Sequence, residues 1–240
     1  MWRVHPRGGK VGQGDQLVLG WPAQFQIGHA QAQPEQRPNL GQPSARFYSG
    51  HMPTITDTTV ALKEWAAVAA ALLDGRQTVL LRKGGIHEKR FLVGDDRFVL
   101  FPTVAHSHAE RVRPEHRDLL TTAACDVGDG TFVVRCGVEL VDAVEVRRLQ
   151  GLDDVTDLHI WTSASVQADR VDFRPRHPLQ VLVVRAVVLP QPVTLERVDA
   201  YGGCRSWVEL PVTWPPGTGT QVHSDERLRA DADRVLAAVA

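Results

Sequence analysis

The stretch LQVLVVRAVVL, residues 179–189, is the strongest strand signal in the sequence. It is an almost unbroken run of aliphatic residues, many of them β-branched, and only Arg185 interrupts it with a charge. A run of this kind predicts a β-strand that is covered on both faces. Because an unpaired charge inside such a strand is costly, we expect Arg185 to have a carboxylate partner or to bind an anionic ligand.

Further strands and helices follow one another on both sides of this strand, without a regular alternation. Strands are expected at QTVLLR (77–82), RFLV (90–93), RFVLF (97–101, ended by Pro102) and TFVVRCGVELVDAVEV (131–146, broken by Gly137). Helices are expected at Val60–Leu73 with Thr59 as N-cap, after Pro114, at 149–158, from Ser163 as N-cap to Arg170, and at Asp225–Val239 with Ser224 as N-cap. This order predicts a single α+β domain, with a mixed or partly closed β-sheet and flanking helices, for which a PUA-like barrel is a fold analogy.

Residues 1–51 differ in composition from the rest of the chain. They contain eight Gln, eight Gly and five Pro but only two acidic residues, and they show no helical or alternating pattern. Such a segment cannot bury enough apolar surface to offset its ordering entropy, so we predict a disordered leader. It is either the product of a mis-assigned start, with Met52 as the true first residue, or a functional Gln/Gly/Pro tail. The domain then spans residues 52–240.

Charge and cysteine content limit the classes of function. The whole chain has a formal net charge of -1, and residues 52–240 carry 22 basic and 26 acidic residues, so any basic surface must be local. The three cysteines, Cys125, Cys136 and Cys204, form no CxxC pair, which argues against a disulfide framework and fits a cytoplasmic protein. No apolar run is long enough for a membrane-spanning helix, and no signal peptide is evident.

The basic loop RKGG, residues 82–85, directly follows an expected strand. Gly84 and Gly85 allow the backbone to turn its N–H groups toward a ligand, while Arg82 offers a planar fork and Lys83 a point charge. This combination favours an anion-binding loop for a phosphate or carboxylate. The alternative is a hairpin turn with solvated charges, because the loop matches neither the P-loop pattern nor GxGxxG.

Histidine and cysteine supply the candidates for catalysis. In TVAHSHAE, residues 103–110, His106, His108 and Glu110 share one side of an extended chain, but no second ligand cluster accompanies them, and we predict no metal or cofactor. His106 remains an acid/base candidate. Cys204 is a candidate nucleophile beside Arg205 in YGGCRSWVEL, residues 201–210, although a buried inert thiol is the alternative. Lys83 is the third catalytic candidate.

Two tryptophans are candidates for contact with a base. In HIWTSASVQADR, residues 159–170, Trp161 could stack on a base while Arg170 contacts a phosphate. Trp207 follows Arg205 and offers the same combination. The alternative for each tryptophan is an ordinary place in the core, and for Arg185 it is a structural ion pair.

Several of these motifs, in this order, resemble the bacterial family of the domain of unknown function 1802. They are ALKEWA (61–66), LLRKGGI (80–86), LFPTVAH (100–106), HIWT (159–162), VLVVRAVVLPQP (181–192) and GGCRSWVEL (202–210). The resemblance covers residues 58–212 and implies no established activity. Some members are fused to, or found with, restriction-endonuclease-like domains of the Mrr type, which implies a link to restriction or DNA processing.

Three functions are therefore open, in the following order. The first is a recognition module for nucleic acid or a nucleotide, whose ligand-binding candidates are Arg82, Lys83, Gly84, Gly85, His106, Trp161, Arg170, Arg185, Arg205 and Trp207. The second is an enzyme acting on a small anionic or phosphorylated substrate through Lys83, His106 or Cys204. The third is an accessory module that docks on a protein partner.

Overall fold

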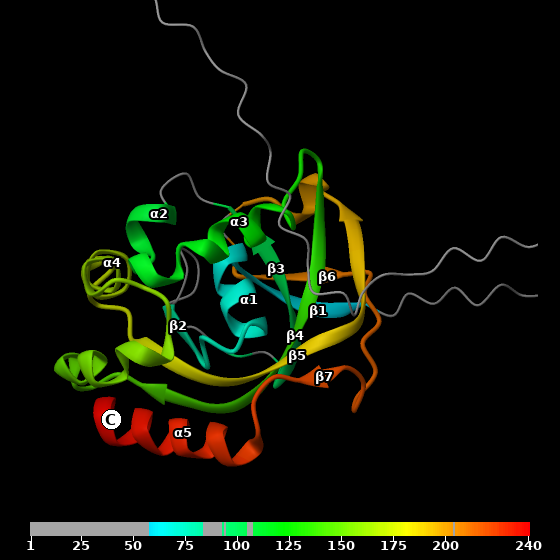
Figure 1. The fold of residues 1–240 in the computed structure, drawn as a ribbon. Helices are drawn as coiled ribbons and strands as arrows, with labels where there is room; N and C mark the ends of the chain where they lie inside the picture. Colours follow the sequence, from blue (N-terminus) through cyan, green and yellow to red (C-terminus); the bar gives the residue numbers. More distant parts are fainter. Residues whose placement is uncertain (1–57, 84–92, 94, 105–107, 204) are drawn as a thin grey trace, which may run out of the picture. The chain divides into compact units, whose positions relative to one another are not determined.

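The apolar stretch at residues 179–189 lies in the longest strand of the computed structural model, β5 (Leu179–Glu196). β5 pairs along most of its length with the antiparallel strand β4 (Thr131–Glu145), and its first residues also pair with β2 (Val79–Lys83). The remaining strands are β1 (Thr59–Trp65), β3 (Arg97–Thr103), β6 (Trp207–Leu210) and β7 (Thr220–Gln221). The sheet has the order β2-β5-β4-β3-β1-β6, and β7 pairs with β5 (Figure 1).

The sheet is mixed, because β1 runs parallel to β3 whereas the other neighbouring strands are antiparallel. The α-helices are α1 (Ala66–Leu73), α2 (His108–Arg111), α3 (Asp118–Ala124), α4 (Ser163–Val166) and α5 (Asp225–Val239). Short helical turns are η2 (Pro114–His116), η3 (Leu149–Leu158), η4 (Gln167–Asp172, a π-helix) and η5 (Asp199–Tyr201). The predicted α+β fold, with a mixed sheet and flanking helices in a single domain, is confirmed.

The structure describes residues 58–83, 93, 95–104, 108–203 and 205–240. The predicted leader and the predicted strand at 90–93, apart from Val93, lie outside these residues. Apolar side chains form two buried clusters in the described part. The larger combines α1 with residues of the sheet such as Leu62, Phe98 and Leu182, and the smaller surrounds Phe101 and Phe132. Helix α5 packs against β4, β5 and η3 (Figure 1).

The first predicted helix is wrong over its first six residues. Residues 59–65 form strand β1, and only Ala66–Leu73 are helical, so Thr59 is not an N-cap. The spacing of apolar residues fits both structures, since Leu62 is buried in either. Pairing of β1 with β3 on one side and β6 on the other decides for the strand. The last helix and its N-cap Ser224, whose hydroxyl accepts from the N–H of Arg227, agree with the prediction.

Two expected breaks in strands do not occur, and one N-cap differs. Pro102 lies inside β3, at a position beyond the residues of β3 that pair with β4. Gly137 lies inside a continuous β4, where a Cβ would lie 2.7 Å from the indole of Trp214. The glycine therefore makes room for a tryptophan instead of ending the strand.

The N-cap of α4 also differs from the prediction. Thr162, not Ser163, caps this helix, because its side-chain oxygen accepts the N–H of Ser165.

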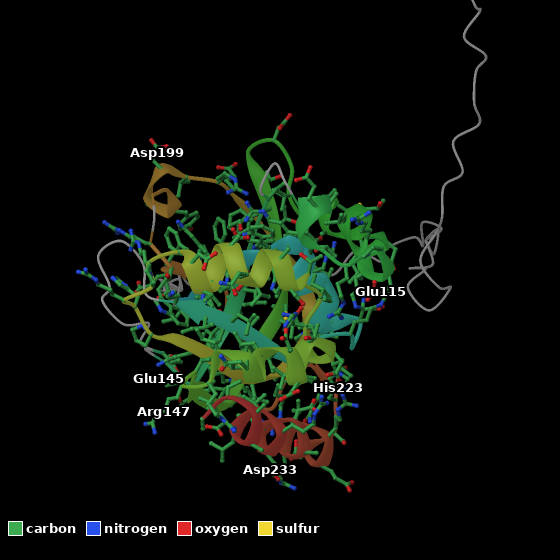
Figure 2. All side chains as sticks on the ribbon, turned by 90° about the vertical axis from the view of Figure 1, so that its left-hand side faces the viewer. Glu115, Glu145, Arg147, Asp199, His223 and Asp233 are labelled. Atoms are coloured by element: carbon green, nitrogen blue, oxygen red, sulfur yellow. The ribbon has the colours of Figure 1, made fainter. Side chains whose placement is uncertain are left out.

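Exposed charges are distributed over the surface. Figure 2 shows Glu115, Asp199 and Asp233 on separate parts of the described chain. Among the described residues, no helix has the length and apolar character needed to cross a membrane.

Candidate functional site

Four of the predicted ligand-binding residues meet where β2 ends beside the π-helical turn η4. The ammonium of Lys83 donates to the backbone carbonyls of Arg170 at 2.7 Å and Val171 at 3.1 Å. In the opposite direction, Nε of Arg170 donates to the carbonyl of Leu81 at 3.0 Å. The two segments are 87 residues apart in the sequence, and these reciprocal bonds hold them together.

Arg82 joins the same group through a largely buried ion pair. Its guanidinium donates to a carboxylate oxygen of Glu64 at 3.0 Å and to the carbonyl of Lys63 at 3.3 Å. The side chains of Arg82 and Glu64 are 12% and 4% exposed. The second carboxylate oxygen of Glu64 accepts the N–H of Trp65 at 2.8 Å. Glu64 thus orients Arg82 and also ties it to the strand that ends in Trp65.

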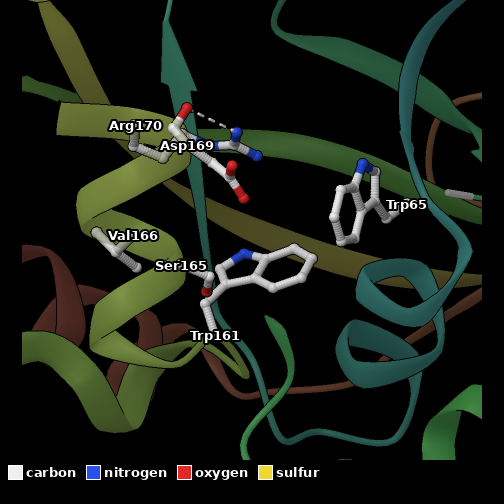
Figure 3. A pocket seen from close by; sticks show the side chains of 6 residues that line it. All are labelled: Trp65, Trp161, Ser165, Val166, Asp169 and Arg170. Atoms are coloured by element: carbon white, nitrogen blue, oxygen red, sulfur yellow. Dashed lines mark hydrogen bonds between the residues drawn. The ribbon is translucent and has the colours of Figure 1, made fainter. Parts of the chain in front are cut away.

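Two tryptophans form the aromatic part of the site. The rings of Trp65 and Trp161 meet edge to face, with centroids 4.7 Å apart (Figure 3). The guanidinium of Arg111 lies 5.6 Å from the ring of Trp65 and forms an ion pair with Asp169. Trp161 is buried, with 6% of its surface exposed. Trp65, which packs against it, is only partly buried. The aromatic surface that reaches solvent here belongs to Trp65.

A small cavity of about 10 Å³ lies among these groups, which is room for one water molecule. The residues that line it are Trp65, Trp161, Ser165, Val166, Asp169 and Arg170 (Figure 3). We call these residues together with Glu64, Arg82, Lys83 and Arg111 the cationic site.

The electrostatics of the cationic site favour an anion. Burial lowers the pKa of Arg170, Glu64 raises it, and the nearby charges of Arg82 and Arg111 lower it further. Burial also lowers the pKa of Lys83, against an opposing effect of Asp172. Among the described residues, neither Lys83 nor Arg170 forms an ion pair, because their hydrogen bonds go to backbone carbonyls. Carbonyls carry no net charge, so the charges of Lys83 and Arg170 are offset through space, by Asp172 for Lys83 and by Glu64 and Asp169 for Arg170, and not by direct ion pairs.

The other predicted ligand-binding residues lie elsewhere or outside the described residues. Arg185 pairs with Glu139 at 2.7 Å and Asp225 at 2.9 Å, which is the predicted structural ion pair. Trp207 packs edge to face against Phe98 at 5.0 Å, on β6, and Arg205 is exposed beside that strand. Gly84, Gly85, His106 and Cys204 lie outside the described residues, so their place in the site stays a prediction.

Sequence reasoning missed six residues of the cationic site, which are Glu64, Trp65, Arg111, Ser165, Val166 and Asp169. Glu64 and Trp65 were assigned to one helix, which concealed that they end strand β1, where the Arg82 side chain from β2 contacts it. Arg111 and Asp169 lie 58 residues apart and carry no motif. Asp169 does precede the predicted Arg170, and this proximity was the one available signal. Within the described part of the chain, no group of three or more His, Cys, Asp or Glu side chains is placed to hold a metal ion.

Comparisons with known proteins match this chain to one family and to distant structures. The model of a family described as "Domain of unknown function (DUF1802)" matches residues 61–234. None of the curated proteins matches the chain. The crystal structure of ASCH from Zymomonas mobilis is similar to this chain with a sequence identity of 12% and a TM-score of 0.35. The similarity covers 75% of this chain and 95% of the ASCH chain. A mutant of the same protein gives 14% identity, a TM-score of 0.33, and coverage of 72% and 94%. Similarity at this level carries no argument about function.

Proposed function

The chain belongs to the family of the domain of unknown function DUF1802, and because that description names no activity, we propose a function from the chain's own residues. The cationic site recognises phosphate groups of a nucleic acid or nucleotide, and the protein is a recognition module. One observation carries this proposal. Lys83 and Arg170 are oriented by hydrogen bonds to backbone carbonyls, and neither forms a direct ion pair with a carboxylate of the described residues.

The exposed edge of the site provides a plausible contact for a phosphate. Arg111 is 34% exposed and its present partner Asp169 is 24% exposed, so a phosphate oxygen can compete with the carboxylate for the guanidinium. Trp65 lies beside the same guanidinium and offers a partly exposed aromatic ring to a base. Phosphate contact and stacking are the two interactions that bind single strands without strong sequence preference.

Recognition explains Lys83 better than nucleophilic catalysis does. A nucleophilic amine has to lose a proton, whereas Lys83 donates two hydrogen bonds to carbonyls that accept from an ammonium. Loss of the proton would weaken the bonds that hold β2 to η4. The side chain therefore acts as a fixed positive charge in this proposal.

Binding of labelled oligonucleotides tests the proposal. Fluorescence anisotropy of matched single-stranded DNA and RNA is measured over a salt series, and the family's implied link to DNA processing makes DNA the first polymer to examine. Arg111→Gln is expected to weaken binding severalfold and to reduce the slope of log affinity against log salt by about one.

The control is Arg234→Gln, which removes an arginine of α5 that is 45% exposed and forms an ion pair with Asp157 of η3. It is expected to leave affinity and salt slope unchanged. Absence of any binding at low salt, or equal effects of the two substitutions, would refute the proposal.

A further inference from the structure

A second cavity lies on another face of the helical segment that borders the cationic site. Ser165 and Asp169 face the tryptophan pair, whereas Ser163, Gln167 and Val171, spaced by four residues, line the second cavity. Its volume is about 310 Å³, which is within the range of sites for small molecules. The opposite wall comes from η3, so two separate helical segments enclose it.

The cavity has an apolar floor and a polar rim. Leu152, Val166 and His159 form the floor, and they are 6%, 7% and 2% exposed. Gln150 and Asp153 are exposed at the rim on the η3 side. Small-molecule sites combine apolar walls with a few placed polar groups in this way.

His159 provides a hydrogen-bond donor in the floor. Its Nδ1 accepts the backbone N–H of Trp161 at 3.2 Å, so in the neutral ring the proton is on Nε2. Burial, followed by the charge of Arg113, lowers the pKa of His159 to about 4, which keeps the ring neutral at pH 7. No described residue forms a hydrogen bond with Nε2, and the ring lines the cavity. This N–H can therefore donate to an acceptor that lies in the cavity.

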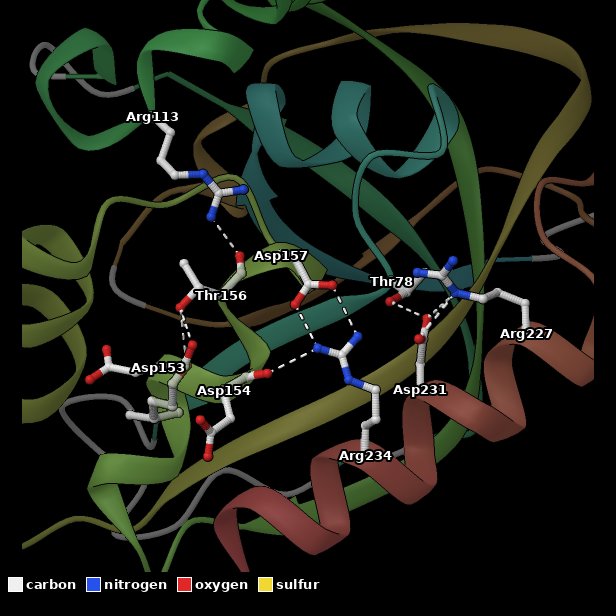
Figure 4. A network of polar contacts seen from close by, with 10 residues as sticks. Thr78, Arg113, Asp153, Asp154, Thr156, Asp157, Arg227, Asp231 and Arg234 are labelled. Carbon is white, nitrogen blue, oxygen red and sulfur yellow. Dashed lines mark hydrogen bonds and ion pairs between the residues drawn. The ribbon is translucent and has the colours of Figure 1, made fainter.

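Charges around the cavity select against an anion. Asp153 has no ion pair among the described residues and stands at the rim near Thr156 (Figure 4). The nearby cation Arg113 is already engaged, because it donates to the carbonyl of Thr156 at 2.5 Å and to Glu115 at 2.9 Å. An anionic ligand would therefore meet an uncompensated carboxylate at the entrance, whereas an N–H group would meet an acceptor.

We propose that this cavity binds a small neutral molecule of the amide or lactam class. Its carbonyl accepts from Nε2 of His159, its N–H faces Asp153, and its apolar part covers Leu152 and Val166. The inference stands independently of the proposed function, since it uses a different cavity and an uncharged ligand.

Binding of ε-caprolactam to the full chain tests the inference by ¹H–¹⁵N NMR. We expect saturable shifts of the His159 ring Nε2–H and of the Trp161 backbone amide, which are joined through the imidazole. Cyclohexanecarboxylate, a carboxylate of similar size, is expected to bind at least about tenfold more weakly. No saturable shift with caprolactam, or equal binding of the carboxylate, would overturn the inference.

Rim substitutions locate the binding. Ser163→Phe fills the cavity from one wall and Gln150→Trp from the other, and each is expected to weaken caprolactam binding about tenfold. Ala164→Phe is the matched control, because Ala164 is equally exposed on the same turn but does not line the cavity. Equal binding by all three folded variants would overturn the inference. Oligonucleotide binding is expected to be unchanged in each, which separates this test from that of the cationic site.

Discussion

Along α5, arginine side chains face carboxylates, whereas at the end of β2 two of the cations face backbone carbonyls. Arg234 pairs with Asp157 at 2.7 Å, and Arg227 with Asp231 at 3.0 Å (Figure 4). In the cationic site, Lys83 and Arg170 are also hydrogen-bonded but form no direct ion pair with a carboxylate of the described residues. Both regions have ordered cations, and they differ in whether every one of the named cations contacts a carboxylate directly. Under the proposed function, the difference distinguishes a face held together by ion pairs from one whose cations are available to a ligand.

Removing the buried carboxylate of Glu64 should have the largest effect on the free energy of unfolding, and it tests whether the two regions differ. Glu64→Gln takes away the negative member of a pair whose side chains are 4% and 12% exposed. Loss of a partner in a buried pair costs about 3 kcal/mol or more in the free energy of unfolding. Asp157→Asn, at an exposed pair of the α5 face, should cost about 1 kcal/mol or less. Urea unfolding measures both, and comparable costs would show that the two regions do not differ.

Acid should destabilise the molecule through His159, which ends η3. Its pKa is about 4 in the folded protein against an ordinary value of 6.5, so the unfolded chain binds the proton more readily. The free energy of unfolding is therefore highest above pH 6.5 and falls as the pH decreases to about 4. The loss attributable to this ring is about 3 kcal/mol, because each unit of pKa difference corresponds to about 1.4 kcal/mol.

Urea unfolding at pH 7 and pH 4.5 measures the effect of His159. The control is His159→Gln, whose amide oxygen can accept the Trp161 N–H but which does not titrate. The variant should lose less stability over this interval than the natural chain. An equal loss in both proteins would contradict the assignment to His159.

A smaller effect is expected where α5 docks on η3. A Cβ on Gly151 would lie 1.9 Å from the carbonyl oxygen of Ala238, so Gly151→Ala must displace the end of α5. Overpacking of this kind costs about 2 kcal/mol. Gly128→Ala is the control, since the nearest atom to its Cβ is the Thr131 hydroxyl at 3.1 Å. Thermal unfolding and limited proteolysis of α5 measure the difference, and an unaffected Gly151→Ala variant would contradict the tight docking.

Local signals explain which parts of the fold were predictable. The apolar run of β5 and the capped helix α5 carry their information within a few residues, and both were predicted. β1 was not, because its identity as a strand depends on β3 and β6, which are distant in sequence. For the site, residue type identified Arg82, Lys83 and Arg170, but the sequence could not show that Lys83 and Arg170 bond to carbonyls and Arg82 to a carboxylate. Those partners are set by tertiary packing.

The close contact of Trp214 with Gly137 has a consequence for the alignment of the strands. The indole occupies the space in which any other residue of β4 would carry its Cβ, and Arg97 stacks on the same ring at 3.3 Å. If β4 slid by one position, Cys136 or Val138 would bring a side chain into that space and collide with the ring. The absence of a Cβ at Gly137 thus helps to fix the register of β4, which pairs with β5, because a shifted β4 would clash with Trp214.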